Sequence, residues 1–153
     1  MAKKLPETSV QNRRARHDYD LRDEFNVGIV LSGQEVKAAR SGHVSLKGSY
    51  VTLKAGELWL INASFSVLHT KPGLSERTVD IGARKLLAKK QEIAAIQSAK
   101  DQGLTIVPLS MTTRTRFIKV KIATAKGKKL HDKRETIKRR DQEREAQRQM
   151  ARA

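Results

Sequence analysis

Short apolar runs separated by turn residues occupy much of the chain and predict β-strands. Three of these runs are rich in Val, Leu, Ile, Phe and Trp: residues 51–54, 58–61 and 65–68. Ala55-Gly56 lies between the first two and predicts a tight turn. In residues 117–122 apolar positions alternate with Lys119 and Lys121, which predicts a half-buried strand with both lysines facing outward. Such runs favour antiparallel pairing in a small sheet or barrel.

Two segments interrupt this pattern and are candidate helices. Residues 84–102 carry an apolar stripe and are followed by Gly103, where a C-cap glycine is expected. The stripe consists of Leu86, Leu87, Ile93, Ala94 and Ile96. Residues 23–31, ended by Ser32-Gly33, are a second candidate, although residues 27–30 also suit a strand. The chain is therefore expected to be mainly β with α, as a compact antiparallel β-barrel with packed helices.

The two ends of the chain differ from this body. Residues 1–11 show no periodicity and predict a flexible N-terminal arm, so the barrel domain is expected over residues 12–125. Residues 126–153 hold 11 basic and 5 acidic residues but few apolar ones, so they cannot offset their ordering entropy alone. They nevertheless place four arginines on one helical face: Arg140, Arg144, Arg148 and Arg152. We expect a basic tail that is disordered alone and helical against a phosphate-lined surface; the alternative is a solvated, solubilising tail.

The net charge of +16 on 153 residues favours a polyanionic partner, because phosphate contacts release condensed counterions. Nucleic acid is the first candidate. An anionic membrane surface is the second, but it requires an amphipathic or lipidated anchor. The sequence has no cysteine, no run of about 20 apolar residues and no signal-like start, so a cytoplasmic protein without a membrane partner is expected.

The sequence offers little catalytic chemistry. Residues 125–129 resemble a phosphate-binding loop but lack its first glycine and its hydroxyl residue. The four histidines show no metal-ligand spacing: His17, His43, His69 and His131. No nucleophile elbow is present. We therefore expect a non-enzymatic protein without a cofactor or metal.

Basic clusters recur along the chain, at residues 13–16, 37–40, 84–85, 89–90, 119–121 and 126–129. Any one of them alone is more often a solvated face. Several on one small barrel predict an electrostatic footprint for nucleic acid.

The order and spacing of nine short motifs resemble those of one family, the SsrA-binding proteins (small protein B) of bacterial trans-translation. The resemblance runs from Asn12 to the end of the chain. The motifs lie at residues 12–19, 28–31, 33–37, 49–50, 84–87, 92–93, 103–109, 125–129 and 131–134.

This resemblance implies an oligonucleotide-binding-like β-barrel with flanking helices and a basic C-terminal tail. It implies binding to the tRNA-like domain of transfer-messenger RNA and its delivery, by a monomer, to stalled ribosomes. The tail is then expected to enter the vacant mRNA channel of the small subunit and to fold into a helix there.

The resemblance also implies roles for individual residues. The RNA contacts expected on the body are Asn12, Arg14, His17, Lys37, Arg40, Arg84, Lys85 and Leu87, although core packing is the alternative for Leu87. Three lysines of the tail are expected to contact backbone phosphates of the RNA: Lys126, Lys128 and Lys129. Gly127 is expected to be a hinge or a point of close RNA approach, and His131 to stack on a base. Ribosome accommodation is expected of the rest of the tail motif: Asp132, Lys133 and Arg134.

Three departures from the family pattern bear on these expectations. Asn26 stands where the family usually has a glutamate, residues 79–85 retain only part of a Pro- and Arg-containing run, and residues 65–79 match poorly. The alternative function is a ribosomal protein or rRNA-assembly factor, against which the intact motif at residues 126–134 argues.

Overall fold

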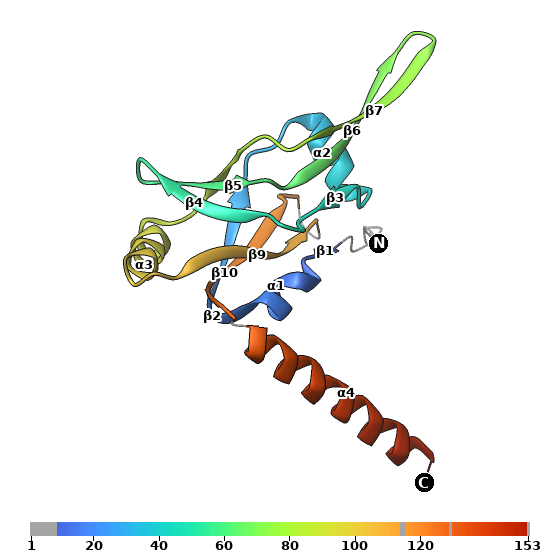
Figure 1. Cartoon of the computed structure of the whole chain (residues 1–153). Helices are drawn as coiled ribbons and strands as arrows, with labels where there is room; N and C mark the ends of the chain where they lie inside the picture. Colours follow the sequence, from blue (N-terminus) through green and yellow to red (C-terminus); the bar gives the residue numbers. More distant parts are fainter. Residues whose placement is uncertain (1–8, 114–115, 129, 153) are drawn as a thin grey trace, which may run out of the picture.

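In the computed structural model the described residues are 9–113, 116–128 and 130–152, without the side chains of Ser9, residues 130–133 and Arg152. Over these residues the chain forms ten strands and four helices (Figure 1). The strands build two sheets in which all pairings are antiparallel. The fold class is therefore mixed α/β with mostly antiparallel sheets.

The larger sheet has seven strands in the order β1-β9-β10-β2-β8-β5-β4. Their bounds are β1 Ser9–Gln11, β2 Tyr19–Ile29, β4 Tyr50–Lys54, β5 Glu57–Ile61, β8 Arg84–Leu87, β9 Thr105–Thr112 and β10 Lys119–Gly127. β4 also pairs with β9 through Val51 and Ile106, so the last strand of the order returns to the second. The predicted turn between β4 and β5 is confirmed: Ala55 and Gly56 have φ values of 52° and 75°, as a two-residue hairpin turn requires.

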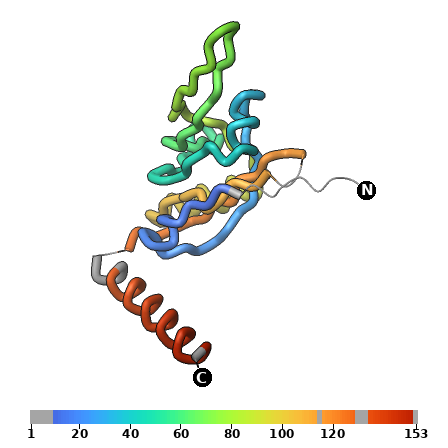
Figure 2. The backbone as a smooth tube through the Cα atoms, turned by 90° about the vertical axis from the view of Figure 1, so that its right-hand side faces the viewer, coloured from blue at the N-terminus to red at the C-terminus, as the bar shows by residue number. Residues whose placement is uncertain are grey.

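The smaller sheet contains β3 Val44–Ser45, β6 Ser64–Lys71 and β7 Leu74–Asp80, in the order β3-β6-β7. β6 and β7 form a hairpin that projects from the body (Figures 1 and 2). Every residue of β7 is exposed. β6 is buried at Phe65 and Val67 but exposed from Leu68 to Lys71, so the outer part of the hairpin presents both strands to solvent.

Four helices accompany the sheets: α1 Arg13–Asp18, α2 Gly33–Arg40, α3 Lys90–Asp101 and α4 Leu130–Arg152. α2 begins after Ser32, whose hydroxyl accepts a hydrogen bond from the Glu35 amide at 3.3 Å. α3 is followed by Gly103 at φ 84°, which confirms the predicted C-terminal glycine. α4 leaves the body at the end opposite the β6–β7 hairpin (Figures 1 and 2).

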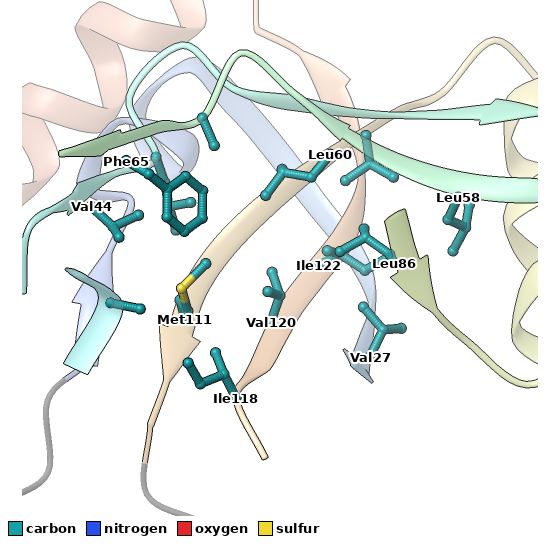
Figure 3. Close-up of a cluster of buried hydrophobic side chains, with 14 of the residues drawn as sticks. Val27, Val44, Leu58, Leu60, Phe65, Leu86, Met111, Ile118, Val120 and Ile122 are labelled. Carbon is teal, nitrogen blue, oxygen red and sulfur yellow. The ribbon is translucent and has the colours of Figure 1, made fainter. Parts of the chain in front are cut away.

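The core is built almost wholly from aliphatic side chains, as the low aromatic content requires. Phe65 is its one fully buried aromatic among the described residues (Figure 3). The same cluster contains Val44 and Val67 of the smaller sheet and, mostly from the larger sheet, Val27, Leu58, Leu60, Leu86, Met111, Ile118, Val120 and Ile122. A second cluster of small side chains lies under α1: Ala15, Val107, Leu109, Ala123 and Ala125. Because these side chains are short, α1 lies close against the outer face of β9 and β10.

The strand predictions at residues 51–54, 58–61 and 65–68 are confirmed by β4, β5 and β6. The strand predicted at residues 117–122 is confirmed from Lys119 onward, where β10 begins. Val120 and Ile122 are fully buried, while Lys119 and Lys121 are exposed. α4 covers most of residues 126–153, whereas the tail was expected to become helical only against a phosphate-lined surface, and that expectation stays a prediction. The predicted disorder of the tail in isolation also stays a prediction.

Three sequence predictions are wrong. Residues 23–29 of the predicted helix 23–31 belong to strand β2, because pairing with β10 along most of its length outweighs their local helical spacing. Residues 84–87 form β8 between β2 and β5, so only the later part of the predicted helix is helical. Within the predicted flexible arm, residues 9–11 instead form β1 and pair with β9, while residues 1–8 lie outside the described residues.

Candidate RNA interface

Asn12 attaches α1 to the body. Its amide N–H donates to the Leu109 carbonyl and its side-chain Nδ2 donates to the Pro108 carbonyl, both at 2.8 Å. The residue is buried, as is Ala15 one turn later. Asn12 was predicted to contact RNA, whereas the structure gives its side chain a positioning role: it fixes α1 so that the next cations face outward.

Three arginines of α1 are exposed as a result: Arg13, Arg14 and Arg16. His17 is half-buried at the end of the helix. Arg14 lies beside a shallow hollow of about 300 Å³ that Tyr50 and Thr105 also line. Arg14 and His17, both predicted as RNA contacts, thus lie on the same short helix. Arg13 and Arg16 were not predicted individually, but they are exposed on that helix as well, because its buried side is taken by Ala15.

The end of β10 lies against the same helix. Gly127 pairs with Tyr19, the residue that follows α1. The Lys128 amide donates to the Asp18 carbonyl at 3.0 Å, and Lys128 Nζ donates to the Arg16 carbonyl and the Thr136 hydroxyl, both at 3.1 Å. Lys128, predicted as a phosphate contact, therefore joins α1, β10 and α4 to one another.

The remaining tail residues are placed to different degrees. Lys126 and Gly127 are exposed, and a Cβ added at Gly127 would meet nothing within 4 Å. Arg134 is exposed on the second turn of α4. The backbones of His131, Asp132 and Lys133 belong to α4, but their side chains lie outside the described residues, as does all of Lys129.

Lys37 and Arg40 lie on α2, at the opposite end of the body from α1 and α4 (Figure 1). Both are exposed, and Arg40 Nη2 donates to the Arg116 carbonyl at 3.3 Å. The structure therefore separates the predicted contacts into two surfaces. We call the first, formed by Arg13, Arg14, Arg16 and His17, the α1 surface; Lys126 is exposed near the end of β10.

Arg84 belongs to neither surface. Its side chain is 5% exposed, and its Nε donates to Glu35 Oε2 at 2.8 Å. Nη1 donates to the Gly82 carbonyl, Nη2 lies 3.5 Å from Asp80, and the guanidinium stacks 4.0 Å above the Phe65 ring. Its predicted role as an RNA contact is thus corrected to a structural one, since all its donors are directed into the protein.

The two neighbouring predictions on β8 have different outcomes. Lys85 Nζ lies 2.9 Å from Glu57 Oε1 in a half-exposed ion pair. Leu87 is 53% exposed, so the alternative of core packing does not hold for it. It lies beside Phe117 and Arg116 at a surface hollow where the Arg116 guanidinium approaches the Phe117 ring. Leu87 is therefore available to a partner.

Asn26, which stands in place of the family's usual glutamate, lies exposed on β2 opposite Lys121. Lys121 Nζ lies 3.8 Å from Glu24 Oε2 instead. Glu24 lies two residues before Asn26, on the same face of the strand.

A family model described as SmpB protein matches residues 9–152, which includes α1, β10 and the tail. The chain belongs to the SmpB family. The match confirms the resemblance that the motifs carried.

Similar proteins extend over nearly the whole chain of this SmpB family member. An SsrA-binding protein of Coxiella burnetii (strain CbuK_Q154) is 49% identical over 92% of this chain and 89% of its own. That of Coprothermobacter proteolyticus is 50% identical over 91% of this chain and 93% of its own. That of Streptococcus pyogenes serotype M3 (strain MGAS315) is 44% identical over 98% and 96%.

A solved structure described as "tmRNA-SmpB: a journey to the center of the bacterial ribosome" contains a similar chain. It superposes with a TM-score of 0.65 at 37% identity, covering 80% of this chain and 86% of the other. The two chains therefore share a fold.

Two further observations concern the described part of this SmpB family member. None of its helices there is both long and apolar enough to cross a membrane. No group of three or more His, Cys, Asp or Glu side chains is arranged there to hold a metal ion.

Proposed function

We propose that this chain binds the tRNA-like domain of transfer-messenger RNA and delivers it to stalled ribosomes for trans-translation. The observation that carries the proposal is the similarity to SsrA-binding proteins over both the α1 region and the tail, at up to 50% identity. The similar chain from a tmRNA-SmpB structure supports the same partners. In this proposal the protein acts in the cytoplasm by binding and catalyses no reaction.

The α1 surface is the proposed reader of the tRNA-like domain. Its arginines are exposed, and none of Arg13, Arg14 and Arg16 faces a carboxylate in an ion pair within the described residues. Arginine presents a planar fork of donors to phosphate oxygens, and His17 offers a ring for an unpaired base. Lys126 adds an exposed point charge near the end of β10.

The body that carries this surface is proposed to be an oligonucleotide-binding-like barrel. The strand order places β4 at the far edge of the larger sheet from β9, yet Val51 pairs with Ile106. This pairing supports the proposal that the six strands from β9 to β4 close into a ring, an arrangement that removes exposed sheet edges in small barrels. Such barrels bind nucleic acid on one face and on the loops that flank it.

The tail is proposed to occupy the vacant mRNA channel as a helix. α4 projects away from the sheets, and its described side chains after Arg134 are almost all exposed and mostly charged or amide-bearing (Figure 2). Such a helix lacks an apolar face to bury, so its cations are available to ribosomal RNA phosphates. Asp132, Lys133 and Arg134 act in accommodation in this proposal, and Lys129 and His131 contact RNA.

Binding of the full chain and of a chain ending at Lys128 to three RNAs tests the proposal. The truncation keeps β10 and the Lys128–Asp18 hydrogen bond. The RNAs are the tRNA-like domain, an ordinary tRNA and a plain duplex at physiological salt. We expect the full chain to prefer the tRNA-like domain and the truncated chain to keep most of that preference. Equal binding of all three RNAs, with the affinity supplied by the tail, would overturn the proposal.

A further inference from the structure

The side chain of Arg77 attaches the exposed strand β7 to the rest of the protein. Its Nη1 lies 2.9 Å from His43 Nδ1 and donates to the Ser66 carbonyl at 3.4 Å. The backbone of His43 is itself fixed, because its amide donates to the Ala38 carbonyl of α2 at 2.8 Å and its carbonyl accepts from the Ser66 amide at 2.9 Å. Arg77 therefore connects β7, across β6, to a residue that α2 holds in place.

The chemistry of this contact fixes the charge of His43. A guanidinium has donors only, so Nδ1 of His43 is the acceptor and carries no proton. The neutral ring then has its proton on Nε2. An imidazolium donates from both nitrogens and cannot accept a hydrogen bond. The contact with Arg77 therefore exists only while His43 is neutral.

Cations surround this contact. Lys37 and Arg40 of α2 and Arg77 of β7 line a hollow of about 510 Å³ between α2 and the β6–β7 hairpin, which we call the hairpin hollow (Figure 1). The side chains that β6 adds to its lining, Leu68 and Thr70, carry no charge, and neither do the two residues of β3. A proton on His43 would place another positive charge beside the Arg77 guanidinium. Like charges at this distance repel one another.

The carboxylates of α2 and β7 do not offset that repulsion. Glu35 of α2 lies 2.8 Å from Arg84, and Asp80 at the end of β7 lies 3.5 Å from the same arginine. Because side chains alternate between the two faces of a hairpin, three other ionisable residues lie on the face opposite Arg77: His69, Lys71 and Glu76. Protonation of His43 is therefore opposed by its surroundings and not compensated by them.

His69 makes a contact of a different kind in the same hairpin. Its Nε2 lies 2.8 Å from the Thr78 hydroxyl, which connects β6 to β7. A hydroxyl can donate or accept, so this bond is possible both for the neutral ring and for the protonated ring. Of the two histidine contacts, the one at His43 alone is lost when the ring gains a proton.

We propose that the His43–Arg77 contact is a pH-sensitive latch, which holds the outer part of the β6–β7 hairpin to the body while His43 is neutral and releases it when His43 is protonated. The neutral form makes the contact, so the latch is closed at higher pH and opens as the pH falls. Histidine is the side chain whose charge ordinarily changes between about pH 5 and 8, which sets the range for the experiment. The latch needs no RNA and is independent of the proposed function.

Two spin labels on the full chain test the latch. The sequence has no cysteine, so Ser75→Cys on the hairpin and Gln91→Cys on α3 provide the two labelling sites, and both positions are exposed. Pulsed electron paramagnetic resonance measures the distribution of distances between the labels at about pH 7.5 and about pH 5.5. Circular dichroism at both pH values confirms that the fold is kept.

Three variants in the labelled chain separate the latch from other effects of pH. His43→Gln replaces the ring with an amide that can accept from Arg77 and does not titrate in this range. Arg77→Gln removes the guanidinium donors. His69→Gln is the matched control, because it removes the other histidine of the hairpin contacts and leaves the latch in place.

We expect the distance distribution of the labelled chain to change from narrow at the higher pH to broad at the lower pH. His43→Gln is expected to show the same distribution at both pH values, Arg77→Gln a broad one at both, and His69→Gln the original change. A distribution that does not respond to pH in the labelled chain, a response that persists in His43→Gln or disappears in His69→Gln, or a narrow distribution in Arg77→Gln overturns the inference. Failure of the proposed function would show differently, as a chain that does not prefer the tRNA-like domain over a duplex.

Discussion

Arg84 and Glu35 form a buried ion pair that joins β8 to α2 across 49 residues of sequence. The Nε–Oε2 distance is 2.8 Å, and the two side chains are 5% and 19% exposed. The pair holds α2 against the body and engages the Glu35 carboxylate, so that this carboxylate does not neutralise the exposed cations of α2. The same contact therefore supports the packing of α2 and leaves the hairpin hollow positive.

Replacing Arg84 with Gln is expected to lower the free energy of unfolding by about 3–5 kcal/mol, because a buried carboxylate then loses its partner. Lys85→Gln is the matched control, since it breaks a half-exposed pair with Glu57 one residue along, at a cost of about 0–1 kcal/mol. Urea unfolding of both variants measures the difference. A small effect at Arg84 would mean that Glu35 is rehydrated and that the pair does not hold α2.

Asn12→Ala is expected to lower the free energy of unfolding by about 1–3 kcal/mol, because the buried Pro108 carbonyl loses its donor. Arg13→Ala, at the next residue, is expected to leave stability within about 0.5 kcal/mol and to weaken RNA binding instead. Thermal unfolding and RNA affinity are measured for both. If Asn12→Ala leaves stability unchanged and lowers only affinity, Asn12 contacts RNA directly.

The local sequence pattern was sufficient to predict a strand where one face of that strand is buried over several residues. The alternation around Lys119 and Lys121 identified β10 because Val120 and Ile122 must face the core on one side. The turn at Ala55-Gly56 was likewise predictable, since two residues with positive φ suit a tight hairpin. Both features depend on neighbours in sequence.

The features that the sequence did not predict depend on contacts between segments far apart in the chain. Residues 84–87 continue the apolar stripe of α3, but β2 and β5 draw them into the sheet. Arg84 is buried because it pairs with Glu35, and no local motif indicates that pairing. Arg77 was missed because its segment matches the family poorly, and only the hairpin brings it 2.9 Å from His43. The sequence therefore indicated the exposed cations of α1, of α2 and of the tail, but not Arg77.

Replacing Lys126 and replacing Lys128 are expected to have different effects on RNA binding and on stability, although the two residues are close in sequence. Lys126 is exposed, so Lys126→Gln is expected to flatten the salt slope of RNA binding by about 1 unit without a change in stability. Lys128→Gln is expected to lower helicity or stability, because the Lys128 ammonium joins the Arg16 carbonyl to Thr136. Salt-dependent binding and circular dichroism separate the two effects. Equal slopes for both variants would place both lysines on phosphates.

The tail motif at residues 132–134 is expected to act after RNA binding. Replacing Asp132, Lys133 and Arg134 by Ala is expected to leave affinity for the tRNA-like domain within a few-fold and to abolish peptide tagging on stalled ribosomes. The physical reason is position: the motif begins α4 beyond the α1 surface, and α4 projects away from the body that reads the RNA (Figure 1).

The matched control for the motif is the triple alanine variant of Arg139, Arg140 and Asp141, which removes the same charges farther along the same helix. Affinity is measured at physiological salt and tagging in a reconstituted translation reaction with a message lacking a stop codon. If tagging depends only on the charge of α4, the two triple variants lose it equally, because long-range attraction to phosphate depends on net charge and little on position. Loss confined to residues 132–134 means that these side chains make specific contacts at the start of α4. A collapse of affinity in that variant would instead assign the motif to the RNA-binding surface.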